Sequence, residues 1–225
     1  MIASGEVWGY GKPITKTGES EVNIDVSRRL AIAQLIASLA LTATASPGAY
    51  GASSSVVAIK SYYARLVSTM RAASGLSIKA RYDRLAPMMA SAFDFATMTR
   101  IAVGPTWSKA SAAQQSQLRD AFARLMGAYY ANRIDGYSGE QFSVDPATEQ
   151  RGGQELVKTK LVKPSGGSTQ INYLMRGSRI IDVYLNGTIS EVASRRAEFA
   201  GILKSGGLDA LLKALHDRSN KLLAG

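Results

Sequence analysis

The feature that most constrains the fold is a change in the spacing of apolar residues near Gly136. Before it, apolar side chains recur every three or four residues, which is typical of helices that pack by one face. After it, apolar and polar residues alternate in four short segments, which favours β-strands. These segments are residues 141–144, 156–162, 170–175 and 179–185, with short glycine-containing connections between them. Connections this short favour hairpins, so we expect an antiparallel sheet.

Helices are expected on both sides of that sheet. Before it, the pattern predicts helices over 56–73, from 77 up to or past Pro87, over 95–103 and from 111 to about 134. Ser111 with Gln114 and Thr188 with Glu191 have the spacing of capping boxes. Glycines at 206–207 divide the region after residue 188 into two helices. The fold class predicted from the residues is therefore α+β, with N-terminal helices, a four-stranded antiparallel sheet and two C-terminal helices.

An apolar run at residues 30–45 follows the pair Arg28 and Arg29. As a helix the run would span roughly 24 Å, less than the ~30 Å of a bilayer core, and small residues follow it. This pattern is typical of a cleaved signal peptide. We expect the mature chain to begin between Ser46 and Ser53, which makes residues 1–51 an extension with a signal peptide and residues 52–225 one domain. A buried core helix or an uncleaved anchor is the alternative interpretation.

Composition removes several kinds of chemistry. The chain has no cysteine and one histidine, His216, which excludes disulfides, thiol nucleophiles, thiolate zinc sites and multi-histidine metal sites. No metal and no cofactor are therefore expected. Lys and Arg number 27 against 17 Asp and Glu, a net charge of +10. In an exported protein, such an excess favours an anionic membrane surface over nucleic acid as a partner.

Much of that positive charge falls early in the expected mature chain. The exposed cations expected to contact anionic lipid are Lys60, Arg65, Arg71, Lys79, Arg81 and Arg84.

Three carboxylates are candidates for a general base, namely Asp94, Asp182 and Glu191. Each also has a structural interpretation. Asp94 suits a helix N-cap, Asp182 alternates with Ile181 and Val183 as on the outer face of a strand, and Glu191 completes a capping box. We expect no catalytic residue.

Several segments together resemble the MlaC / toluene-tolerance family of periplasmic phospholipid-binding proteins. They are FDFATMTR at 93–100, GPTW at 104–107, SAAQQ at 111–115, YYA at 129–131, RIIDVY at 179–184 and GTIS at 187–190. The stretch ISEVASRRAEF at 189–199 is most similar to the hopanoid-associated HpnM branch. One departure is the sequence Gly177, Ser178, Arg179, where the family usually has a tryptophan before the strand.

The resemblance implies a periplasmic carrier that holds the acyl chains of a phospholipid or a hopanoid-type lipid in an apolar cavity between a curved sheet and helices. It also implies exchange with an inner-membrane ABC-transporter complex and with outer-membrane lipoprotein or porin partners. If the sheet lines the cavity, alternation predicts which side chains contact lipid. The sheet would contribute Tyr173, Met175, Ile181 and Val183, and the helical segments Met88, Met126, Tyr130, Ile189, Val192 and Phe199.

Two other functions remain open at this stage. One is an isomerase-like enzyme with an acidic base in an apolar pocket, and the other is an envelope scaffold without a cavity. An enzyme would need one of the three carboxylates inside the pocket, which a carrier does not. A carrier needs connected apolar space of at least ~300–1,000 Å³, which a scaffold does not.

Overall fold

The computed structural model describes residues 52–225, so the expected signal peptide and its cleavage point lie outside the described residues. The helices before the sheet are α1 (Ser54–Arg71), α2 (Ile78–Ala92), α3 (Phe95–Val103), the short 3₁₀ helix η1 (Gly104–Lys109) and α4 (Ala112–Arg133). The strands are β1 (Gln141–Arg151), β2 (Gln154–Val162), β3 (Ser168–Arg176), β4 (Arg179–Leu185) and β5 (Ile189–Ser190), and α5 (Glu191–Ala224) follows. The α+β order expected from the sequence is confirmed.

The sheet is antiparallel, and its strands follow the chain in the order β1-β2-β3-β4-β5. Four of these strands were expected, and β5 adds two residues that pair with the end of β4. β1 is an edge strand whose pairing with β2 shifts between Val144 and Thr148. Pro146 lies inside this shift, where its missing N–H removes no regular ladder bond.

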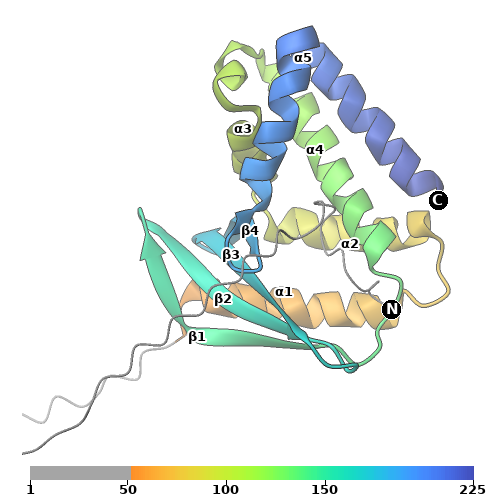
Figure 1. Cartoon of the computed structure of the whole chain (residues 1–225), viewed down its shortest axis with the longest axis vertical. Helices are drawn as coiled ribbons and strands as arrows, with labels where there is room; N and C mark the ends of the chain where they lie inside the picture. Colours follow the sequence, from red (N-terminus) through yellow and green to blue (C-terminus); the bar gives the residue numbers. More distant parts are fainter. Residues whose placement is uncertain (1–51) are drawn as a thin grey trace, which may run out of the picture.

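The helices form two groups around the sheet (Figure 1). α1 runs along the sheet and contacts β1 and β2, and α2 lies beside α1. α3, α4 and α5 gather at the other end of the molecule, where the C-terminal half of α5 descends alongside α4. None of the helices in the described part of the chain is long and apolar enough to cross a membrane.

The core between α1, the sheet and the other helices is rich in aromatic rings. They form a continuous series in which each neighbouring pair has centroids between 4.4 and 6.3 Å apart. In order, the series is Phe142, Tyr63, Tyr173, Tyr62, Phe93, Phe95, Phe122 and Phe199. It therefore connects the edge strand β1 to the first half of α5 through the centre of the protein.

The helix signals in the sequence were partly right. The capping box of Ser111 and Gln114 is confirmed at the start of α4. The box predicted from Thr188 is wrong: Ser190 is the N-cap of α5, because residues 189–190 are held as β5 against β4. Pro87 does not end α2, which continues to Ala92. The expected break between the C-terminal helices is a kink at Gly207, where φ is +68°.

Candidate functional site

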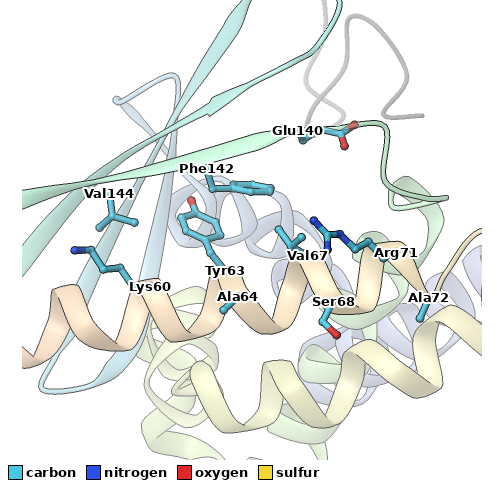
Figure 2. Close-up of a pocket in the computed structure, with 10 residues that line it drawn as sticks. All are labelled: Lys60, Tyr63, Ala64, Val67, Ser68, Arg71, Ala72, Glu140, Phe142 and Val144. Atoms are coloured by element: carbon cyan, nitrogen blue, oxygen red, sulfur yellow. The ribbon is translucent and has the colours of Figure 1, made fainter.

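A groove of about 690 Å³ lies between the exposed side of α1 and the edge strand β1. The residues that line it come from α1 and the residue just after it, and from β1 and the residue just before it. They are Lys60, Tyr63, Ala64, Val67, Ser68, Arg71, Ala72, Glu140, Phe142 and Val144. The two elements approach each other because residues three or four apart share one face of a helix, while alternate residues share one face of a strand. Figure 2 shows Tyr63 and Val67 of α1 extending toward Phe142 of β1.

The middle of the groove is apolar. Its floor is the Tyr63 ring stacked on the Phe142 ring, with centroids 4.4 Å apart and planes 29° apart. Val67 and Val144 lie on either side of this stacked pair (Figure 2). Because Tyr63 is also a member of the aromatic series, the floor of the groove is continuous with the core.

The polar side chains of the groove lie toward its ends. Lys60 and Arg71 are eleven residues apart on α1, a separation of about 16 Å along a helix axis. The guanidinium of Arg71 lies over the Tyr137 ring, 4.8 Å from its centroid. Glu140 is buried, and its Oε2 accepts a hydrogen bond of 2.8 Å from the backbone N–H of Ser138. An amphipathic molecule with an apolar middle and an anionic group suits this arrangement.

Tyr63 is one of four buried tyrosines in the core; the others are Tyr62, Tyr130 and Tyr173. The Tyr63 Oη is 2.6 Å from the Oγ1 of Thr159, which in turn donates to the carbonyl oxygen of Ile171. The single hydroxyl hydrogen of Thr159 is used in that bond, so Tyr63 is the donor to Thr159. Burial raises the pKa of Tyr63 to about 12. It raises the pKa values of the other three above their ordinary value as well, so all four hydroxyls remain protonated near neutral pH.

Nine of the ten side chains predicted to contact lipid are buried. Eight of them belong to the apolar core: Met88, Met126, Tyr130, Tyr173, Met175, Val183, Val192 and Phe199. Ile181 is also buried, but it is the extra residue where β3–β4 pairing shifts from Leu174↔Asp182 to Met175↔Ile180. The alternation of side chains between the two faces of β4 is therefore interrupted at Ile181. Ile189 is 40% exposed in β5, so the structure does not place it with the others.

The interpretation of Asp182 as an outward-facing residue is wrong. Its side chain is 8% exposed because the first turn of α5 folds over it. Oδ1 accepts from the N–H groups of Val183 and Val192, and Oδ2 accepts from the Ser190 hydroxyl. Burial raises the pKa of Asp182, although these bonds oppose the shift. The carboxylate thus joins the end of the sheet to the start of α5.

The other two carboxylates also have structural partners. Asp94 is the N-cap of α3, as expected, and accepts from the N–H and the hydroxyl of Thr97. Partial burial would raise the pKa of Asp94, but those hydrogen bonds, with Arg176 and Arg179 nearby, lower it. Glu191 does not complete a capping box. It is fully buried, and its Oε1 accepts from the Nε of Arg195 at 2.7 Å.

The cations expected at the surface divide into two groups. Arg81 is buried, and its Nη1 donates to the carbonyl oxygen of Ile134 at 2.9 Å, so it does not contribute exposed charge. Lys79 is exposed but pairs with Asp83 at 2.5 Å. Lys60, Arg65, Arg71 and Arg84 are exposed. Within residues 52–225, no group of His, Asp and Glu side chains is arranged to hold a metal ion.

The groove itself was not anticipated from the sequence. The alternation at 141–144 put Phe142 and Val144 on one face, and helical spacing put Lys60, Ala64, Val67 and Arg71 on one side of α1. Nothing in either pattern indicates that these two faces meet, because they are about 80 residues apart.

Comparison with known proteins identifies a protein family and solved structures of similar fold. Residues 60–217 match the family model described as MlaC protein. The fold is similar to that of a phospholipid-binding protein from Ralstonia solanacearum, whose structure was determined in complex with a phospholipid. That match has a TM-score of 0.67 and 20% sequence identity, and it covers 75% of this chain and 98% of the other. At this identity the likeness establishes the fold. No curated protein sequence matches the chain.

Proposed function

The chain belongs to the MlaC protein family, and from that premise we propose that it is a periplasmic lipid-binding carrier. The observation that carries the proposal is the groove between α1 and β1, whose apolar floor continues into the buried aromatic core. Its volume of about 690 Å³ falls within the roughly 300–1,000 Å³ of small-ligand sites. The Ralstonia solanacearum protein of the same fold holds a phospholipid, which supports the same class of cargo here.

The acyl chains would occupy the space between the sheet and the helices. In this proposal the groove is the entrance, and the buried side chains beyond it contact the chains. Removal of each methylene from water stabilises the complex by about 0.8 kcal/mol, so an apolar interior supplies the affinity without a catalytic group. The lipid-contacting residues proposed are Met88, Met126, Tyr130, Tyr173, Met175, Ile181, Val183, Val192 and Phe199.

The proposed partners are those that the resemblance to the MlaC family implies, and the hopanoid-type cargo is the one that the similarity of residues 189–199 to the HpnM branch implies. We propose a phospholipid or a hopanoid-type lipid as cargo, exchanged with an inner-membrane ABC-transporter complex and with outer-membrane lipoprotein or porin partners. Residues 1–51 would supply the export signal, and residues 52–225 the single lipid-binding domain. The structure gives no support to the enzyme alternative, because Asp94, Asp182 and Glu191 all hold structural hydrogen bonds.

The test is lipid content combined with a variant that closes the groove. Lipids extracted from the purified protein are identified by mass spectrometry for the parent chain and for Ala64→Trp. Ala64 is an exposed groove residue on α1, so the change should cost only ~0.5 kcal/mol of helix propensity, or about 1–2 °C in melting temperature. The variant should lose most of its lipid.

Ala197→Trp is the matched control. Ala197 is also exposed on a helix, but it lies on α5 and does not line the groove. This variant should retain its lipid. Absence of lipid from the parent chain would contradict the carrier function, and equal lipid in all three proteins would contradict the groove as entrance.

A further inference from the structure

Two hollows flank α1, and adjacent tyrosines of that helix face them. Tyr63 forms part of the floor of the groove. Tyr62 borders a smaller hollow of about 180 Å³ on the other side of α1, between α1, the end of α2 and the β3–β4 hairpin. The rings of Tyr62 and Tyr63 have centroids 5.7 Å apart. Both tyrosines are buried, and each borders one of the two hollows.

On the Tyr63 side, the hydroxyls are occupied. Tyr63 donates to Thr159, and Thr159 donates to the carbonyl oxygen of Ile171. Tyr173 is close enough to Tyr63 for the two hydroxyls to interact. Asn172 Oδ1 accepts from the backbone N–H of Thr159, which fixes the position of this threonine. This half of the cluster is a complete network that needs no ligand.

The Tyr62 side is different. The Tyr62 side chain is 1% exposed, and within residues 52–225 no group completes a hydrogen bond of normal geometry with its hydroxyl. The hydroxyl of Tyr130 is near enough for each to perturb the pKa of the other. A buried hydroxyl whose neighbour does not complete a well-formed hydrogen bond is unfavourable, since it has given up its hydrogen bond to water. A bound molecule that offers an oxygen atom would satisfy it.

We propose that the Tyr62 hydroxyl, beside Tyr130, is an internal recognition site for an uncharged oxygen atom of the lipid. The inference rests on the proposed carrier function and deepens it. The oxygen would be either the ester carbonyl of a glycerolipid or the hydroxyl of a polycyclic lipid, and both can accept a hydrogen bond from Tyr62. A phosphate is a poor occupant of the buried position, because Arg65, the cation that lines the adjoining hollow, is exposed at the surface, and burial of an unpaired charge is very unfavourable.

The site would make the protein select lipids that carry a suitable acceptor oxygen. A binding site with a buried donor discriminates against an otherwise identical ligand that lacks the acceptor, because the donor then stays unpaired. The apolar core alone could not make that distinction, since it contacts both ligands equally.

The test uses the full chain, stripped of lipid and reloaded with matched probes. One pair is phosphatidylglycerol with ester-linked chains and its ether-linked counterpart of equal length. The other pair is a triterpenoid alcohol and its parent hydrocarbon. The parent protein should bind the oxygen-bearing member of at least one pair about five- to tenfold more tightly, the effect of one buried hydrogen bond. The pair that shows the difference identifies the source of the oxygen.

The Tyr62→Phe variant should lose that discrimination. It should also keep the melting temperature of the unliganded protein or raise it, because the hydroxyl completes no hydrogen bond of normal geometry that could be lost. Tyr82→Phe is the control, since Tyr82 packs beside Gly127 of α4 away from the cluster, and it should discriminate as the parent does.

Equal affinity of the parent for both members of both pairs would overturn the inference and leave the carrier function intact. Preserved discrimination in Tyr62→Phe would overturn it as well. If the parent binds none of the four probes, the carrier function fails and the inference fails with it.

Discussion

The ion pair of Glu191 and Arg195 permits a sharp test of how the sheet is joined to α5. Glu191 is fully buried and Arg195 is 5% exposed, with Nε and Oε1 2.7 Å apart. Arg195 also pairs with Glu198 and lies over the Tyr129 ring. The Arg195→Met change would leave a carboxylate buried without its cation. We expect a loss of about 3–5 kcal/mol in the free energy of unfolding at pH 8.

The stability cost of Arg195→Met should be larger at high pH than at low pH. Burial raises the pKa of Glu191, and Arg195 opposes this, so removal of Arg195 should raise the pKa further. An acid with a raised pKa in the folded state destabilises the fold at high pH, and this cost disappears as protonation proceeds at lower pH. Relative to the parent, the cost of Arg195→Met should therefore fall by about 1.4 kcal/mol per pH unit as the pH is lowered from the folded-state pKa of the variant to the lower folded-state pKa of the parent.

The assay is urea denaturation followed by circular dichroism at pH 5 and pH 8, for the parent, Arg195→Met, Glu191→Gln and the double variant. In the Glu191→Gln background the arginine change should cost only about 1–2 kcal/mol, because no uncompensated charge remains. Asp182 and Arg133 also influence Glu191, so the single glutamine variant controls for their contribution. A cost that is independent of pH, or equal in both backgrounds, would refute this account of the ion pair.

Three further predictions concern cargo, membrane and export. Replacement of Val183 or Met175 by Trp should displace lipid with a near-normal melting temperature. A collapsed melting temperature would instead show a solid core, in which overpacking costs ~1–3 kcal/mol or more. Vesicle binding should require anionic lipid and weaken with salt, and equal binding to neutral vesicles would argue against Lys60, Arg65 and Arg71 as contacts. N-terminal sequencing of periplasmic protein should give a first residue within 46–53, whereas an intact N-terminus on membranes would exclude cleavage.

Local patterns were enough to predict the order of the elements. The change of period at Gly136 separates the helices from the strands, and the Ser111 box marks the start of α4. These signals depend on neighbours in sequence, so they hold whatever the tertiary structure. The capping box predicted from Thr188 was wrong because it ignored a tertiary contact. Ile189 pairs with Leu185 as part of β5, so α5 begins only after Ser190.

The site was harder to predict because the burial of its residues depends on contacts between elements that are distant in the sequence. Alternation predicted that Asp182 and Val183 lie on opposite faces of β4, but it could not show that the start of α5 covers the face that carries Asp182. Helical spacing puts the adjacent Tyr62 and Tyr63 about 100° apart on α1, which would normally leave one of them exposed. Both are buried because α1 is packed between α2 and the sheet. The sequence alone therefore could not predict that Tyr62 and Tyr63 are both buried.

The position of the groove has a consequence for how cargo could be exchanged under the proposed function. Transfer of a chain of about 15 methylenes into water would cost roughly 12 kcal/mol, so release through solvent would be extremely slow. The chain must pass directly from the groove to another apolar surface. β1 is the edge strand there, with interrupted pairing between Val144 and Thr148, and so it has fewer bonds to break than the central strands. With Lys60 and Arg71 toward the two ends of the groove, an anionic membrane or partner would be drawn to the side of the protein from which the lipid must leave.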